Sequence, residues 1–85
     1  MYQVYILKSK KDNSLYVGYT NNIERRLNEH NTGQVKYTES RKPWNLVYYE
    51  SFASLEDARQ RERNLKHFGK AFGQLKRRIE NSLNR

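Results

Sequence analysis

Three short stretches of the chain carry apolar or aromatic side chains with the spacing of β-strands. Residues 2–8 (YQVYILK) and 15–19 (LYVGY) predict two strands that form a hairpin around a polar turn at residues 9–14. Because the first stretch is apolar on both of its faces, we expect it to be a central strand. Residues 44–52 (WNLVYYESF) predict a third strand.

Further along the chain, apolar residues recur with the period of a helix. Thr20 or Asn21 is expected to cap a first helix that runs to about Asn31, and Gly33 is expected to end it. The segment 34–43 has no clear period, which predicts a loop.

Two more helices are predicted in the C-terminal part. Ser54 opens the first of them, with Asp57 in an approximate capping box, and this helix runs to about Phe68 and ends at Gly69. The last helix covers about residues 70–83. The predicted order is therefore β-β-α-β-α-α, an α+β class of fold, in one domain over the whole chain.

The hairpin register follows from the length of its loop. A four-residue loop at residues 9–12 would place Tyr5 directly opposite Tyr16. Gly18 weakens the second strand, so we expect it to permit the close approach of a backbone or a ligand.

Polar residues fall where the first helix should be buried. Ile23 and Leu27 define its inward face. At the angular step of a helix, His30 lies about 20° from Ile23 and Arg26 about 60° from it, whereas Arg25 points to the opposite side. We therefore expect His30 and Arg26 on or beside the buried face.

The second helix carries a carboxylate in the same kind of position. Glu62 falls between Leu55 and Ala58 on the inward face. An unpaired buried charge is costly, so this residue needs a partner, a cation or a function. A pair with Lys66 or Arg59 on its own helix is the simpler interpretation.

The other candidates also have simpler interpretations. His30 can be a buried histidine bonded to a backbone carbonyl, and Arg26 can extend out of the edge of the core. Tyr5 and Tyr16 can be ordinary strand residues. It is the convergence of one acid, one arginine, one histidine and two tyrosines on a small core that indicates a site.

Composition narrows the class of function. The 85 residues contain no cysteine, which excludes disulfides and thiolate metal sites. The 17 lysines and arginines against nine acids give a net charge of +8, which favours a polyanionic partner such as nucleic acid. No apolar run approaches the roughly 20 residues of a membrane span, so we expect a soluble cytoplasmic protein.

These side chains can perform one kind of chemistry together. A lone carboxylate can hold Mg²⁺ that retains several waters, and an arginine can bind phosphate oxygens. A tyrosine or histidine can accept a proton from an attacking water, while the metal polarises the phosphoryl oxygen. The set is typical of a phosphodiesterase with one metal ion.

Several motifs in fixed order carry a family resemblance. They are residues 4–6 (VYI), 16–18 (YVG), 20–30 (TNNIERRLNEH), 41–50 (RKPWNLVYYE) and 58–66 (ARQRERNLK). This set resembles the GIY-YIG nucleases, and it is most similar to their small stand-alone bacterial members. The resemblance implies a three-stranded antiparallel sheet flanked by three helices, and Mg²⁺-dependent cleavage of DNA, with Mn²⁺ as a possible substitute.

The resemblance also implies a role for each candidate residue. Tyr5 would act as the general base or orient the water, and Tyr16 would support it and contact the phosphate. Arg26 would neutralise charge on the phosphate, and His30 would assist through a hydrogen bond. Glu62 would be the only protein ligand of the metal. Since tyrosine is a poor base at its ordinary pKa of about 10, we expect Arg26 and the metal to lower the pKa of Tyr5.

The leading hypothesis is a structure-selective or non-specific DNA endonuclease, acting on single-stranded, branched or duplex DNA in repair or recombination. The alternative is a nucleic-acid-binding module with weak or no catalysis, and a third possibility is a structural basic protein. Whether the chain acts as a monomer or a weak dimer is open. The residues expected to contact nucleic acid are Lys8, Arg41, Lys42, Lys66 and Lys70.

Overall fold

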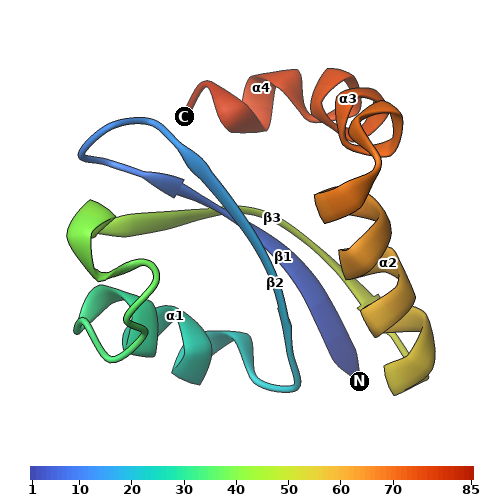
Figure 1. The fold of residues 1–85 in the computed structure, drawn as a ribbon, viewed down its shortest axis with the longest axis horizontal. Helices are drawn as coiled ribbons and strands as arrows, with labels where there is room; N and C mark the ends of the chain where they lie inside the picture. Colours follow the sequence, from blue (N-terminus) through green and yellow to red (C-terminus); the bar gives the residue numbers. More distant parts are fainter.

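Strand β1 is the centre of the molecule, as its two apolar faces predicted. The computed structural model describes all 85 residues. It places β1 (Tyr2–Ser9) between β2 (Leu15–Thr20) and β3 (Trp44–Phe52) in an antiparallel sheet of order β2-β1-β3 (Figure 1). The helical elements are α1 (Ile23–Asn31), the 3₁₀ turn η1 (Glu39–Arg41), α2 (Leu55–His67), α3 (Gly69–Arg78) and α4 (Glu80–Leu83).

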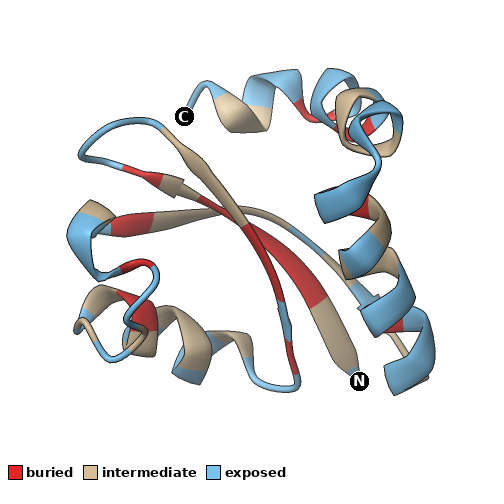
Figure 2. Cartoon of the chain, viewed as in Figure 1, coloured by how far each residue is buried: buried red, intermediate tan, exposed pale blue.

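The two faces of the sheet pack against different helices. Val4 and Ile6 of β1 lie in the larger core cluster with residues of α2 and α3, such as Leu65 and Leu75. The alternate residues of β1, Tyr5 and Leu7, form a second buried cluster on the other face together with Trp44 of β3. This face packs against α1. Figure 2 shows buried residues along β1, where they contribute to both clusters.

The hairpin register differs from the prediction. Tyr5 pairs with Gly18, and Tyr16 pairs with Leu7. Tyr5 and Tyr16 are therefore diagonal neighbours on one face, with ring centroids 6.4 Å apart, and are not directly opposite. The close approach expected at Gly18 is made by the Tyr5 ring itself, since a Cβ on Gly18 would lie 2.6 Å from the Tyr5 Cζ.

The turn explains the shift in register. The Ser9 amide donates to the Ser14 carbonyl at 2.8 Å, so the four-residue loop consists of residues 10–13 and lies one residue further along the chain than predicted. Inside the loop, the Ser9 hydroxyl oxygen accepts hydrogen bonds from the amides of Lys11 and Asp12. Asn13 completes the turn with a φ of 64°, a conformation that asparagine tolerates better than most residues.

Helix α1 begins later than predicted and ends where predicted. Its N-cap is Asn22, whose side chain accepts from the Arg25 amide, and not Thr20 or Asn21. The Thr20 hydroxyl oxygen accepts instead from the Asn22 amide at 3.1 Å, which sets up the turn into the helix. Gly33, with a φ of 79°, follows the end of the helix.

The C-terminal helices follow the predicted pattern with one break. Ser54 caps α2 through the Asp57 amide, as predicted. The predicted last helix is interrupted at Ile79, which is buried and separates α3 from α4. None of the helices combines the length and the hydropathy that a membrane crossing requires.

The Tyr5–Gly18 contact makes a prediction about stability. We expect Gly18→Ala to destabilise the protein by about 1–3 kcal/mol, because the new methyl group overlaps a buried ring that cannot move freely. Denaturant unfolding measures the change.

Gly73→Ala is the matched control. The nearest atom to its added Cβ is 3.9 Å away, and Gly73 lies inside α3. This variant should gain about 0.5–1 kcal/mol from helix propensity. Equal stability losses for the two variants would contradict the steric argument.

Candidate active site

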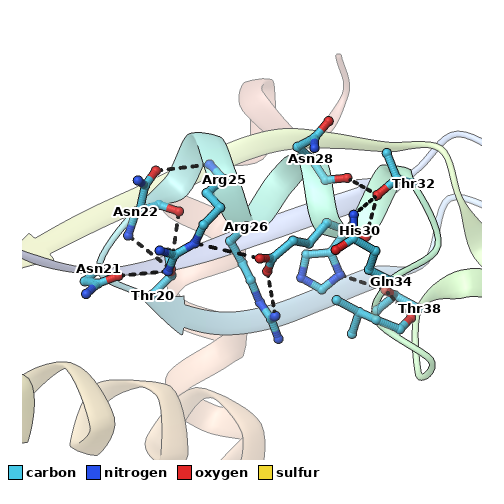
Figure 3. Close-up of polar contacts among 12 residues, drawn as sticks. Thr20, Asn21, Asn22, Arg25, Arg26, Asn28, His30, Thr32, Gln34 and Thr38 are labelled. Carbon is cyan, nitrogen blue, oxygen red and sulfur yellow. Dashed lines mark hydrogen bonds and ion pairs between the residues drawn. The ribbon is translucent and has the colours of Figure 1, made fainter.

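A buried chain of hydrogen bonds links β1, α1 and the loop before η1. The Tyr5 hydroxyl lies 2.9 Å from His30 Nε2, and His30 Nδ1 lies 2.7 Å from the Thr38 hydroxyl. All three residues are buried. Figure 3 shows the His30 ring directed from α1 towards Thr38. The position of His30 confirms the helical phase derived from Ile23.

The protons in this chain can be assigned by counting donors. The Thr38 hydroxyl donates to the Val35 carbonyl at 3.3 Å, so its oxygen is free to accept from His30 Nδ1–H. His30 Nε2 then carries no proton and accepts from the Tyr5 hydroxyl. Thr38 thus fixes the tautomer in which His30 can receive the Tyr5 proton.

Two opposing effects, burial and the nearby Arg26, set the pKa of Tyr5. Burial raises the pKa of Tyr5 to about 12, and this effect exceeds the opposing hydrogen bond and charge of Arg26. Arg26 does lower this pKa, as expected, but by less than burial raises it, and the further lowering expected from the metal stays a prediction. Tyr5 is therefore a protonated phenol at neutral pH.

His30 is neutral for the same physical reason. Burial, with the positive charge of Arg26, lowers the pKa of His30 to about 4. A neutral imidazole and a protonated phenol match the donor assignment above. The pair is poised as hydrogen-bond donor and acceptor, with neither partner charged.

Arg26 lies at the rim of this buried pair. Its guanidinium donates to the Glu29 carboxylate at 2.9 Å, and its side chain is 35% exposed. Arg25, by contrast, is 58% exposed and bonds to Asn21 on the surface (Figure 3). Helical phase therefore separated the two arginines correctly.

Glu62 approaches the same site from the other helix layer. Its carboxylate is half-buried and forms an ion pair with Lys66 at 3.0 Å, which is the simpler interpretation given above. The Lys66 ammonium also lies 5.3 Å from the centre of the Tyr16 ring. Lys66 thus joins the Glu62 carboxylate to the Tyr16 side of the site, and the negative charge of Glu62 is one of the smaller causes of the raised Tyr5 pKa.

The site thus forms at the edge of the sheet. Tyr16 belongs to the edge strand β2, and its ring centroid lies 5.1 Å from that of His30. Side chains of α1 reach this edge from one face, and those of α2 reach it from the other. The structure brings together the five candidates Tyr5, Tyr16, Arg26, His30 and Glu62.

The five expected nucleic-acid contacts do not lie together. Arg41 and Lys66 line a groove of about 490 Å³ beside Tyr16. Lys70 is exposed at the start of α3, and Lys42 is exposed beyond η1. Lys8 donates to the Leu83 carbonyl at 2.6 Å, which anchors α4 to the sheet.

Two residues of the loop were missed by the sequence argument. Thr38 completes the buried hydrogen-bond chain, and Tyr37 lines the groove. In the sequence they are marked only by an aromatic residue next to a hydroxyl residue within a polar segment. The Trp44 indole, which donates to the Thr38 carbonyl at 3.1 Å, holds this part of the loop in place.

Comparisons with known proteins identify the family of this chain. The family model described as the GIY-YIG catalytic domain matches residues 1–77. A UPF0213 protein of Staphylococcus haemolyticus is 52% identical over 68 residues, which are 79% of this chain and 82% of that protein. A UPF0213 protein of Clostridium perfringens is 51% identical over 67 residues, covering 78% and 71%. The solution NMR structure of a UPF0213 protein from Bacillus halodurans is similar with a TM-score of 0.50 and 43% identity, covering 80% of this chain and 73% of that one.

Burial of neutral His30 predicts a loss of stability in acid. The unfolded chain, with the ordinary histidine pKa of 6.5, takes up a proton before the folded protein does at about 4. The stabilisation is therefore complete above pH 6.5 and is lost as the pH falls towards 4. We expect a decrease of up to about 3 kcal/mol in the free energy of unfolding from this group.

Denaturant titrations at several pH values measure this loss. His30→Gln should flatten the dependence in this pH range. His67→Gln is the control, because His67 is exposed and should leave the dependence unchanged. An identical pH dependence in the wild type and the His30 variant would rule out the assignment.

Proposed function

Since the chain belongs to the GIY-YIG family, we propose that it is a metal-dependent endonuclease that hydrolyses DNA phosphodiester bonds. A catalytic domain of this family indicates a nuclease acting on nucleic acid. The observation that supports the proposal most directly is the convergence of Tyr5, His30 and Arg26 with Glu62 at one edge of the sheet.

Arg26 is placed to bind the scissile phosphate. Its guanidinium has more N–H groups than the single hydrogen bond to Glu29 uses, and it is partly open to solvent. A guanidinium binds phosphate oxygens through paired, charge-assisted hydrogen bonds. Arg26 would thus hold the phosphate beside Tyr5 and offset the charge that develops on it.

Tyr5 and His30 together can move the proton of the attacking water. The water would donate its proton to the Tyr5 oxygen while the Tyr5 proton passes to His30 Nε2, and His30 Nδ1–H stays bonded to Thr38. This relay needs no phenolate, which a pKa of about 12 makes scarce. The negative phosphate would stabilise the imidazolium that forms at His30.

Glu62 is the residue that would hold a divalent metal, typical of nucleases of this family. The chain has no cluster of three acidic or histidine side chains, so a cation at Glu62 would need water or substrate oxygens to fill its coordination. Such sparse protein ligation fits Mg²⁺, with Mn²⁺ as a substitute. When bound, the cation would polarise the phosphoryl oxygen and stabilise the leaving alkoxide.

A binding module with weak or no catalysis is the second candidate. One observation favours it: Lys66 already occupies one oxygen of Glu62. Both functions predict binding of DNA. Only the nuclease predicts metal-dependent cuts.

Glu62→Gln tests the metal assignment. We expect it to slow cleavage by more than about 100-fold, because it removes the one protein carboxylate available to the metal. DNA affinity and fold should be retained. The measurement is nicking of labelled single-stranded, branched and duplex DNA with and without Mg²⁺.

Glu56→Gln is the control for that experiment, since Glu56 is exposed in the first turn of α2. It should cut at the wild-type rate. Wild-type binding with no Mg²⁺-dependent nicks on any substrate would instead establish the binding module.

The pH profile tests the relay. We expect kcat/KM to be level between about pH 7 and 9, because the protonated phenol and the neutral imidazole are the prevailing forms there. Initial rates at saturating Mg²⁺ measure it. A tenfold rise per pH unit would show that the phenolate of Tyr5 is the active form instead.

A further inference from the structure

A groove with aromatic and basic walls lies beside the candidate active site. It extends outward from Tyr16, and its volume is about 490 Å³. Leu15, Val17 and Leu65 contribute its apolar lining, and Tyr37, Arg41, Lys66 and Phe72 the rest. The loop before β3 supplies one side and the α2–α3 corner supplies the other, with β2 between them (Figure 1). None of Tyr37, Phe72 and Val17 takes part in the proposed chemistry.

Tyr37 is the most unusual residue of this groove. The residue is 76% exposed. Its ring has one aromatic neighbour, Tyr16, at a centroid distance of 6.2 Å. The Arg41 guanidinium lies 5.7 Å from the Tyr37 ring centre and 5.0 Å from that of Trp44. An exposed ring backed by a guanidinium is a flat surface on which another ring can stack.

The opposite side of the groove repeats this pairing. Phe72 is half-buried, and the Lys76 ammonium lies 4.8 Å from its ring centre. Neither Arg41 nor Lys76 forms an ion pair with an acid of the chain. Their charges are therefore available to an anionic ligand, in a protein whose net charge is already +8.

Exposed aromatic faces and unpaired cations together select one chemical class of ligand. A nucleobase stacks on an aromatic ring through its flat face, and its phosphates attract the neighbouring cations. In a duplex the faces of the bases are already covered by adjacent base pairs. Away from the ends of a duplex, therefore, it is an unpaired nucleotide that can offer a free face to Tyr37.

We propose that this groove binds an unpaired nucleotide next to the phosphodiester to be cut, so that the substrate is DNA with a single-stranded stretch. This proposal rests on the proposed nuclease function and specifies its substrate. Stacking on Tyr37 places one base on the groove side of Tyr16, and the adjoining phosphate then faces the edge where Arg26 and Tyr5 lie.

Fluorescence anisotropy tests the groove without any cleavage. Two labelled probes are compared in EDTA. One is a single-stranded oligothymidylate of 12 nucleotides, and the other is a blunt duplex of the same length. We expect tighter binding of the single strand. Tyr37→Ala should weaken single-strand binding by about 5- to 100-fold, the effect of losing one stacked base. Tyr37→Phe, which keeps the aromatic face, should bind like the wild type.

Tyr49→Ala is the matched control. Tyr49 is 55% exposed but lies on β3, outside the groove, so its loss should leave affinity unchanged. Wild-type preference for the duplex, or equal effects of the Tyr37 and Tyr49 variants, would overturn the proposal. Because this experiment measures no cleavage, it tests the groove independently of the nuclease function. Tyr37→Ala tests the groove, and Glu62→Gln tests the nuclease function.

Discussion

The buried hydrogen bond between Tyr5 and His30 is the constraint on which the rest of the site depends. It joins the central strand to α1, and through Thr38 it joins both to the loop before η1. Burying these polar groups is costly unless each finds a partner, and here each does. The Tyr5 side chain that makes this bond lies close against Gly18 of β2, where any other residue's Cβ would meet the ring. Fold and site therefore share one local requirement.

A central strand with a different helix layer on each face also explains where the site lies. The interior of such a sheet has no room for a charged substrate, so chemistry is confined to an edge. At the β2 edge, α1 supplies a histidine and an arginine from one layer, and α2 supplies an acid and a lysine from the other. Glu62 and Arg26 thus reach one place although the sheet separates their helices.

The sequence predicted much of this arrangement and missed parts that depend on single side chains. Apolar periodicity placed β3 with the correct bounds and put His30 inside, because burial is a property that repeats along an element. The hairpin register was wrong because Ser9 still pairs with Ser14, which moves the loop one residue along the chain, and its hydroxyl oxygen binds amides inside that loop. Thr38 has no periodic neighbours that could have revealed it. The net rise in the Tyr5 pKa was not predicted, because the sequence showed the nearby charge of Arg26, while the larger effect, burial, exists only in the folded chain.

The resting site combines two kinds of interaction that respond differently to a phosphate. The ion pairs of Arg26 with Glu29 and of Lys66 with Glu62 are partly exposed, and such pairs contribute little to stability, on the order of 0–1 kcal/mol. An entering phosphate can therefore take over either cation at small cost and release a carboxylate oxygen as it does so. The Tyr5–His30 bond is buried and stays in place during that exchange. Under the proposed function, binding of the substrate anion and exposure of the Glu62 oxygen to a cation would thus be coupled through Lys66, which links the acid to the groove beside Tyr16.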